Sequence, residues 1–405
     1  MSNTAQRLQN PAEILIWGRP VWKLNWQILS AFTNVCVRRL VLQRPKVPSW
    51  SFRYEATVEF TKALISGTIT ESDVDLLENG SAVEKHKVLQ KMYELQQFVN
   101  SGGKPVLPGS TLQPCMVGGM AAEWIRPPEA HGRGRRRGAD GCRAVLYLHG
   151  GAYIACGINT HRRLMSHVAV TSGLPVLAVE YRLMPAAVFD DILEDAVRAF
   201  RHLADECGFL PAEIALAGDS AGGHLALALA LHLKETAGPA QTPGAIFGLS
   251  PWLDPAGDSP QSHASWEQFS EYDYIGGAPE AMRMTHIGLR GHKYASLLSR
   301  ELVQEARGLC PILIQVGDHE CLYGQAMELA RMADDEELPN LHIQVYAEQV
   351  HVFHMFDEET PMARKALEEA GRFLRAPAAA LTAMSSDTVK RRAERPRSVQ
   401  ILASD

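Results

Sequence analysis

Short apolar runs and longer amphipathic stretches follow one another in a regular order through most of this chain. The apolar runs have the length and composition of buried strands and lie at 143–149, 175–180, 213–218, 244–249, 311–316 and 342–346. Stretches with a helical pattern separate most of them, for example 191–206 and 223–235. Such alternation is typical of a mostly parallel sheet with helices on both faces, so we predict an α/β fold. On such sheets ligands bind at the carboxyl ends of the strands.

A glycine-flanked serine lies between one of these strands and a helix, in the motif Gly218-Asp219-Ser220-Ala221-Gly222. A serine in that place must form a very tight turn, and the flanking glycines permit it because they have no Cβ to clash. The helix that follows points free N–H groups and the positive end of its dipole at the serine. The pattern is that of a nucleophile elbow, which makes Ser220 the candidate nucleophile. A Gly-Ser loop that arose by chance is the alternative.

A glycine-rich loop follows the strand predicted at 143–149, with the sequence His149-Gly150-Gly151-Ala152-Tyr153. Glycines in this place let backbone N–H groups approach a substrate oxygen, one strand–helix–strand unit before the elbow. We therefore expect the N–H groups of Gly150, Gly151 and Ala221 to form an oxyanion hole. A glycine turn without any chemistry is the alternative interpretation.

With these motifs and several further segments in the family's order, the chain resembles the hormone-sensitive-lipase-like branch of the α/β hydrolases, the fold-3 carboxylesterases. The resemblance covers residues 105–376, and the further segments lie at 122–127, 180–185, 193–196, 249–254, 312–317 and 351–356. It implies an α/β-hydrolase fold with a mostly parallel central sheet, helices on both faces and a helical cap. Met184-Pro185-Ala186 departs from the family's usual Ala-Pro-Glu after Tyr-Arg-Leu.

A serine is a weak nucleophile unless a histidine takes its proton and an acid holds that histidine. The resemblance assigns His351 as the general base, since it follows the last strand and opens the His-Val-Phe segment. His354 is the alternative base. For the acid the resemblance favours Glu320, at a position where relatives usually carry Asp, and Asp318 stays open as the alternative.

This triad implies the hydrolysis of a small carboxylic ester with a short-to-medium acyl group, such as an acetylated metabolite, through an acyl-enzyme. Neither a metal nor an organic cofactor is implied. Acyl transfer and amide hydrolysis use the same triad and stay open as alternatives. A non-catalytic ligand receptor is a further alternative, although receptors that resemble this branch lack the base histidine.

Composition and charge mainly exclude other classes of function. The net charge of −6, with 21% charged and 46% apolar residues, fits a core-forming enzyme and argues against a nucleic-acid-binding protein. Seven dispersed cysteines without metal-binding spacing suggest reduced thiols, so we expect an intracellular, cytoplasmic protein. The polar first ten residues lack the apolar core of a secretory signal, so we do not expect secretion.

We expect a helical cap region at 1–104, a catalytic domain at 105–376 with a cap insert at 254–300, and a disordered tail at 377–405. Trp22, Trp26 and Leu29 mark one face of a helix near the N-terminus, which polar residues interrupt too often for a transmembrane span. Residues 14–40 have two interpretations, a cap helix packed on the enzyme and a peripheral contact with a membrane surface. The pattern specifies no oligomeric state.

Overall fold

A single mixed sheet forms the centre of this computed structural model, which describes residues 15–16, 19–128, 141–255, 257, 260–389, 396 and 398–402. Within that part of the chain, nine strands pair in the order β11-β10-β9-β8-β7-β5-β6-β4-β3. Their bounds are β3 Thr111–Val117, β4 Met120–Arg126, β5 Ala144–Leu148, β6 Val176–Val179, β7 Ile214–Asp219, β8 Ala245–Leu249, β9 Ile312–Gly317, β10 Leu341–Tyr346 and β11 Val399–Leu402. Strands from β11 to β6 pair in parallel, and β4 and β3 continue the sheet as antiparallel strands.

Helices cover both faces of this sheet, as the alternating pattern predicted. Successive side chains of a strand point to opposite faces, so Val145 and Tyr147 of β5 join one core while Leu146 and Leu148 join the other. The helices on the first face are α6 (Ile158–Ser172), α13 (Pro361–Arg375) and α14 (Pro377–Val389). Those on the second face are α7 (Phe189–Arg201), α8 (Ala221–Ala237) and α12 (Tyr323–Asp335).

The helix after the elbow, α8, lies almost entirely inside the protein. Its sequence alternates leucine and alanine, which are strong helix formers, and the residues from Ala221 to Leu231 are all buried. A helix that is apolar on all sides is stable only when other elements surround it. The helix that follows Ser220 is therefore held in one fixed direction.

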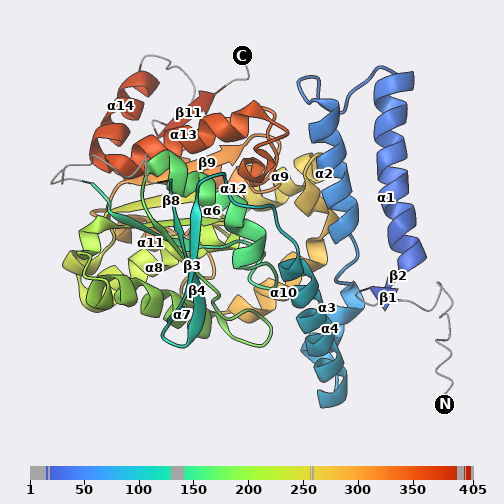
Figure 1. Cartoon of the computed structure of the whole chain (residues 1–405), viewed down its shortest axis with the longest axis horizontal. Coiled ribbons are helices and arrows are strands. Elements are labelled where there is room, and N and C mark those ends of the chain that lie inside the picture. Colours follow the sequence, from blue (N-terminus) through green and yellow to red (C-terminus); the bar gives the residue numbers. More distant parts are fainter. Residues whose placement is uncertain are drawn as a thin grey trace.

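The N-terminal helices form an arm beside the sheet, and Figure 1 shows α1 on the outer side of α2. The arm holds a short β1–β2 pair (Leu15–Ile16 and Arg19–Pro20), α1 (Val21–Cys36), a π-helical turn (Val37–Val41), α2 (Phe52–Ile65), α3 (Glu71–Asn79) and α4 (Ala82–Ser101). Trp50, which precedes α2, and Tyr54, in its first turn, pack into an apolar cluster with three residues that follow β10, namely Val350, Phe353 and Phe356. The arm therefore contacts the loop that carries His351.

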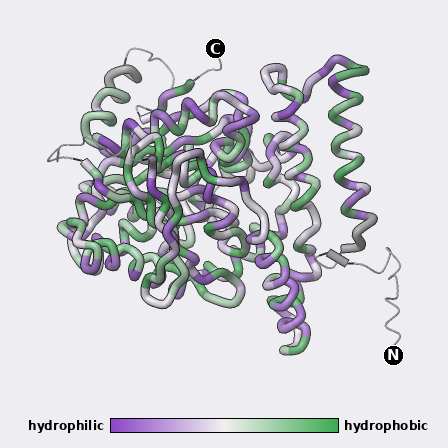
Figure 2. The backbone as a smooth tube through the Cα atoms, in the orientation of Figure 1, coloured by the Kyte–Doolittle hydropathy of each residue, from purple (hydrophilic) through white to green (hydrophobic). Residues whose placement is uncertain are grey.

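Residues 254–300 contain two helices, α9 (Pro260–Phe269) and α10 (Pro279–Leu289), separated by a 3₁₀ turn at Tyr274–Gly277. The next helix, α11 (Arg300–Glu305), leads into β9. Figure 2 shows hydrophobic residues concentrated in the body of the molecule and recurring along α1. In the described part of the chain, no helix is both long enough and apolar enough to cross a membrane.

The expectation of a disordered tail at 377–405 is wrong for two segments. Helix α14 buries Leu381 and Met384 in the same core as α13, and β11 pairs in parallel with β10 from Val399 onward. An uncovered edge of β10 would leave a row of N–H and C=O groups unpaired, and β11 pairs with them. Residues 390–395, 397 and 403–405 lie outside the described residues.

Candidate active site

Ser220 occupies the turn between β7 and α8 by itself. The strand ends at Asp219, the helix begins at Ala221, and Ser220 has φ 50° and ψ −120°, a backbone conformation that non-glycine residues rarely adopt. Two backbone hydrogen bonds hold it there, from Ser220 N–H to the Leu249 carbonyl and from Trp252 N–H to the Ser220 carbonyl, each of 2.9 Å. The turn is thus fixed by the end of β8.

The motif glycines are required by close packing as well as by the turn. A Cβ at Gly222 would lie 2.0 Å from the Leu148 carbonyl oxygen, and one at Gly218 would lie 2.4 Å from the Gly222 oxygen. Neither backbone neighbour can move without displacing β5 or α8. These glycines therefore bring the elbow against the end of the strand that leads into the oxyanion loop.

His351 and Glu320 face one another in the interior. Nδ1 of His351 lies 3.8 Å from Oε1 of Glu320, and the two side chains are 3% and 0% exposed. Both atoms are buried, and neither has a hydrogen-bond partner among the described residues. Buried polar atoms are almost always paired, and catalytic hydrogen bonds often shorten when substrate binds, so these two atoms are placed to pair with each other.

One hydroxyl group links the candidate acid to the loop of the candidate base. Ser250 Oγ donates to Oε2 of Glu320 at 2.7 Å and accepts the N–H of Val352 at 3.1 Å. Gly317 N–H donates to the same carboxylate oxygen at 3.0 Å, which leaves Oε1 directed to His351. Since Leu249, the last residue of β8, holds the Ser220 turn, two consecutive residues at the end of this strand connect Ser220, Glu320 and the loop of His351.

The two alternatives left open by the sequence have other partners. Asp318 accepts the N–H of Glu348 at 2.6 Å and lies 2.7 Å from Nδ1 of His319, with 30% of its side chain exposed. His354 is buried, lies 3.0 Å from Oε1 of Gln315 through Nε2, and burial lowers its pKa to about 3. Asp318 and His354 therefore do not face one another as Glu320 and His351 do, because each is bonded to a different partner.

Burial disfavours the charged form of His351, but the carboxylates of Glu320 and Asp273 outweigh burial and raise the pKa of His351. A histidine with a raised pKa accepts a proton more readily. This is the property that a general base needs when it deprotonates a serine.

The expectation that the N–H of Gly150 serves as an oxyanion donor is wrong, because this N–H donates to Oδ1 of Asp219 at 3.0 Å. The following residues Gly151 and Ala152 have positive φ values of 111° and 53°. Their N–H groups have no acceptor among the described residues. Ala221 opens α8, where N–H groups lack partners inside the helix. The free donors of this region are thus one residue further along the loop than the glycine pattern suggested.

Asp219 fixes the glycine-rich loop through its hydrogen bond to Gly150, a role that the motif alone does not reveal. Its carboxylate is 2% exposed, accepts the hydroxyl of Tyr147 at 2.8 Å and lies 3.1 Å from Nε2 of His161. Burial acts to raise the pKa of Asp219, but His161 and Tyr147 outweigh it and lower that pKa. His149 stacks on Tyr181 with ring centroids 4.2 Å apart, and burial lowers its pKa to about 4.

Known proteins of one family resemble this chain. A family model described as the alpha/beta hydrolase fold matches residues 145–355. The acetyl-hydrolase of Streptomyces hygroscopicus is 34% identical over 274 residues, which cover 68% of this chain and 85% of that protein. The chain belongs to the α/β-hydrolase family.

Two further relatives indicate the branch of the family. Esterase LipU of Mycobacterium tuberculosis is 34% identical to this hydrolase over 242 residues, covering 58% of this chain and 79% of LipU. A crystal structure of an esterase from the bacterial hormone-sensitive lipase family shares 31% identity with a TM-score of 0.58, covering 70% of this chain and 90% of that one. The predicted fold and branch are confirmed, and this hydrolase is a serine ester hydrolase of the hormone-sensitive-lipase-like group.

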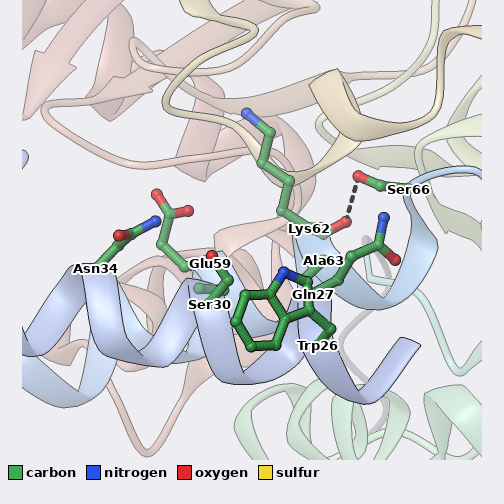
Figure 3. Close-up of a pocket in the computed structure, with 9 residues that line it drawn as sticks. Trp26, Gln27, Ser30, Asn34, Glu59, Lys62, Ala63 and Ser66 are labelled. Carbon is green, nitrogen blue, oxygen red and sulfur yellow. Dashed lines mark hydrogen bonds between the residues drawn. The ribbon is translucent and has the colours of Figure 1, made fainter. Parts of the chain in front are cut away.

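A separate cavity of about 380 Å³ lies in the arm of this hydrolase, between α1 and α2 (Figure 3). Its lining residues are Trp26, Gln27, Ser30, Ala31, Asn34, Glu59, Lys62, Ala63 and Ser66. None of the candidate catalytic residues is among them. The cavity is therefore a feature of the arm.

We predict that Asp219→Asn lowers kcat about 10–100-fold. The carboxylate binds Gly150 and pairs with His161, and it thereby holds the loop that carries the candidate oxyanion donors. Steady-state ester hydrolysis with a thermal unfolding scan measures this. Tyr147→Phe is the matched control, because it removes one hydrogen bond to the same carboxylate and keeps its charge, and it should cost less. An unchanged kcat in folded Asp219→Asn would show that the loop keeps its position without the carboxylate.

Proposed function

We propose that this hydrolase cleaves small carboxylic esters with short-to-medium acyl groups, with Ser220 as nucleophile, His351 as general base and Glu320 as the acid. The observation that carries the proposal is the facing pair of otherwise unpartnered buried atoms, His351 Nδ1 and Glu320 Oε1. The shared anchor of all three residues on Leu249 and Ser250 supports it. The acetyl-hydrolase relative supports a short acyl group, such as that of an acetylated metabolite.

In the proposed reaction, His351 takes the proton of Ser220 as Oγ attacks the ester carbonyl. The N–H groups of Gly151, Ala152 and Ala221 stabilise the oxyanion, and each such donor contributes about 3 kcal/mol. His351 then protonates the leaving alcohol, and Glu320 stabilises the imidazolium throughout. Water hydrolyses the acyl-enzyme with His351 again as base. The steps call on side chains, backbone and water, so no metal or organic cofactor is part of the proposal.

We predict that p-nitrophenyl acetate, butyrate and decanoate are hydrolysed and that Ser220→Ala lowers kcat at least ~10³-fold, because the triad acts as a unit. The ranking of the three chain lengths defines the acyl pocket. A folded wild-type protein without turnover would contradict ester hydrolysis of this kind. It would favour acyl transfer, amide hydrolysis or ligand binding on the same site.

The choice of acid gives a second prediction. Glu320→Gln should lower kcat at least ~10²-fold, whereas Asp318→Asn should change it by a factor of about three or less. Glu320 raises the pKa of His351, and the base works only when deprotonated. Activity is therefore lost as the pH falls through that pKa, and the acid limb of kcat/KM should shift to lower pH in Glu320→Gln. The opposite ranking of the two variants would make Asp318 the acid.

We also propose that residues 14–40 make a peripheral contact with a membrane surface. Helix α1 and the turn after it expose large apolar side chains, and one of them, Trp26, also lines the cavity between α1 and α2: Trp26, Leu29, Phe32, Val37 and Leu40. Residues 14–54 contain seven Lys and Arg and no Asp or Glu, in a chain of net charge −6. Apolar residues with a basic flank suit a surface of anionic lipid.

Two arginines at this end of the arm have a different role. Arg39 Nε contacts Oε2 of Glu55 at 2.5 Å, and Arg38 contacts Oε1 of the same carboxylate at 3.0 Å. Glu55 is fully buried on α2. These arginines fasten the turn after α1 to α2, so the proposed membrane contact relies on the apolar side chains and the other basic residues of the segment.

We predict that the protein floats with vesicles of phosphatidylcholine and phosphatidylserine, and that a Leu29→Glu, Leu40→Glu double variant does not, since both side chains are more than half exposed. Hydrolysis of p-nitrophenyl acetate should be the same in both. Val83→Glu, a change of an exposed apolar residue on α4, is the control and should leave flotation intact. Equal flotation of all three proteins would exclude this surface.

An intracellular, cytoplasmic location is part of the same proposal. All seven cysteines are free thiols, and those at Cys142 and Cys321 are buried. Unpaired cysteines are typical of proteins kept in a reducing compartment.

A further inference from the structure

Asp273 is a buried carboxylate that the proposed reaction does not use. It lies between α9 and the 3₁₀ turn at Tyr274–Gly277, in the cap, and has no exposed surface. Its Oδ2 accepts the N–H of Cys321 at 2.8 Å, and its Oδ1 accepts the N–H of His351 at 3.4 Å. Cys321 directly follows Glu320. One cap side chain therefore binds the backbone beside the proposed acid and the backbone of the proposed base.

The residue after Asp273 contacts the same base through its side chain. The ring of Tyr274 lies 6.0 Å from the imidazole of His351 and 5.9 Å from the ring of Phe356, measured between centroids. Both contacts come from the cap and meet the loop after β10. The loop of His351 is thus held by a backbone hydrogen bond and a ring contact from one short cap segment.

The arm supports this cap segment from the other side. Nζ of Lys62 on α2 donates to the carbonyls of Ser270 and Glu271. Tyr54 of the same helix accepts the N–H of Val350 at 3.5 Å through its hydroxyl. Asp273 is therefore enclosed between α2, the acid loop and the base loop, and it cannot turn toward solvent without displacing one of them.

The surroundings of Asp273 contain few positive charges for a buried carboxylate. Burial and the carboxylate of Glu320 raise its pKa to about 6, and the nearby imidazole of His351 acts in the opposite direction. The other titratable groups that act with it are Lys62, Cys321, Tyr54 and Tyr274. Burying a charged carboxylate costs free energy unless a partner compensates the charge. The charge of Asp273 in turn raises the pKa of His351.

We propose that Asp273 is a positioning residue for ester hydrolysis: it fixes the acid and base loops relative to one another and supports the positive charge of His351 in the transition state. This inference rests on the proposed roles of Glu320 and His351. It also assigns a task to the cap, which would align the catalytic groups as well as cover them.

The test is Asp273→Asn, which keeps the shape of the side chain and one acceptor oxygen but removes the charge and the second acceptor. With p-nitrophenyl acetate we expect kcat to fall about 10–100-fold and KM to change less than about threefold, because the loss concerns the transition state. Since Asp273 raises the pKa of His351, its removal should also shift the acid limb of kcat/KM to lower pH. A purely structural residue would not move that limb.

Two matched variants sharpen the result. Glu271→Gln removes a charge from the same segment, but the Glu271 side chain is exposed, so kcat and the acid limb should stay as in the wild type. Asp273→Glu restores a carboxylate and should return the acid limb toward its wild-type position even where kcat is only partly recovered. Thermal unfolding of all variants identifies any that fail to fold.

The proposal is overturned if folded Asp273→Asn keeps its kcat, or if its kcat falls while the acid limb stays in place and Asp273→Glu restores nothing. Either result, obtained while Ser220→Ala remains inactive, leaves the proposed triad intact and rejects only the role of Asp273. Activity that survives in Ser220→Ala would instead reject the proposed function itself.

Discussion

The hydroxyl of Ser250 is the contact on which the arrangement of the site depends. It donates to the buried carboxylate of Glu320 and accepts the N–H of Val352, the residue after His351. The neighbouring Leu249 carbonyl accepts the N–H of Ser220. Ser250 itself has a positive φ of 45°, a strained conformation that places these groups at the end of β8. The end of one central strand thereby sets the spacing of three groups that come from three different loops.

The buried carboxylate of Asp219 positions the oxyanion loop, as Ser250 positions the three candidate catalytic residues. Asp219 connects the end of β7 with Gly150 and His161, and its hydrogen bond takes the first N–H of the glycine loop out of use. The donors that remain lie beside the Ser220 turn because Gly222 allows close contact with β5. The nucleophile and its oxyanion donors are therefore positioned by a single packed junction of β5, β7 and α8.

The cap and the arm extend this fixed centre outward. Asp273 and Tyr274 hold the His351 loop from the cap. Helix α2 contacts the same cap segment through Lys62, which donates to the Glu271 carbonyl, and the same loop through Tyr54, which accepts the N–H of Val350. Arg39, in the turn after α1, pairs with Glu55 of α2 and so holds the end of α1 against α2. A continuous series of contacts thus runs from the outermost helix to the base. This is the physical basis on which the arm, the cap and the reaction are connected.

The sequence alone determined the features that are local. Apolar runs of strand length gave the parallel sheet, and the glycine-flanked Ser220 gave the elbow, because both depend on a few neighbouring residues. Three features depended on contacts between distant segments, and only the tertiary structure decided them. Asp219 ends β7 and Gly150 lies in the loop after β5, so no spacing could reveal that their hydrogen bond removes an oxyanion donor. Asp318 and Glu320 are two residues apart, so their spacing does not show which one faces His351. The hydrogen bond from Ser250 directs Glu320 toward His351, and the N–H of Glu348 holds Asp318 away from it. The four residues of β11 carry too short a pattern to predict a strand, and the unpaired edge of β10 gives them their structure.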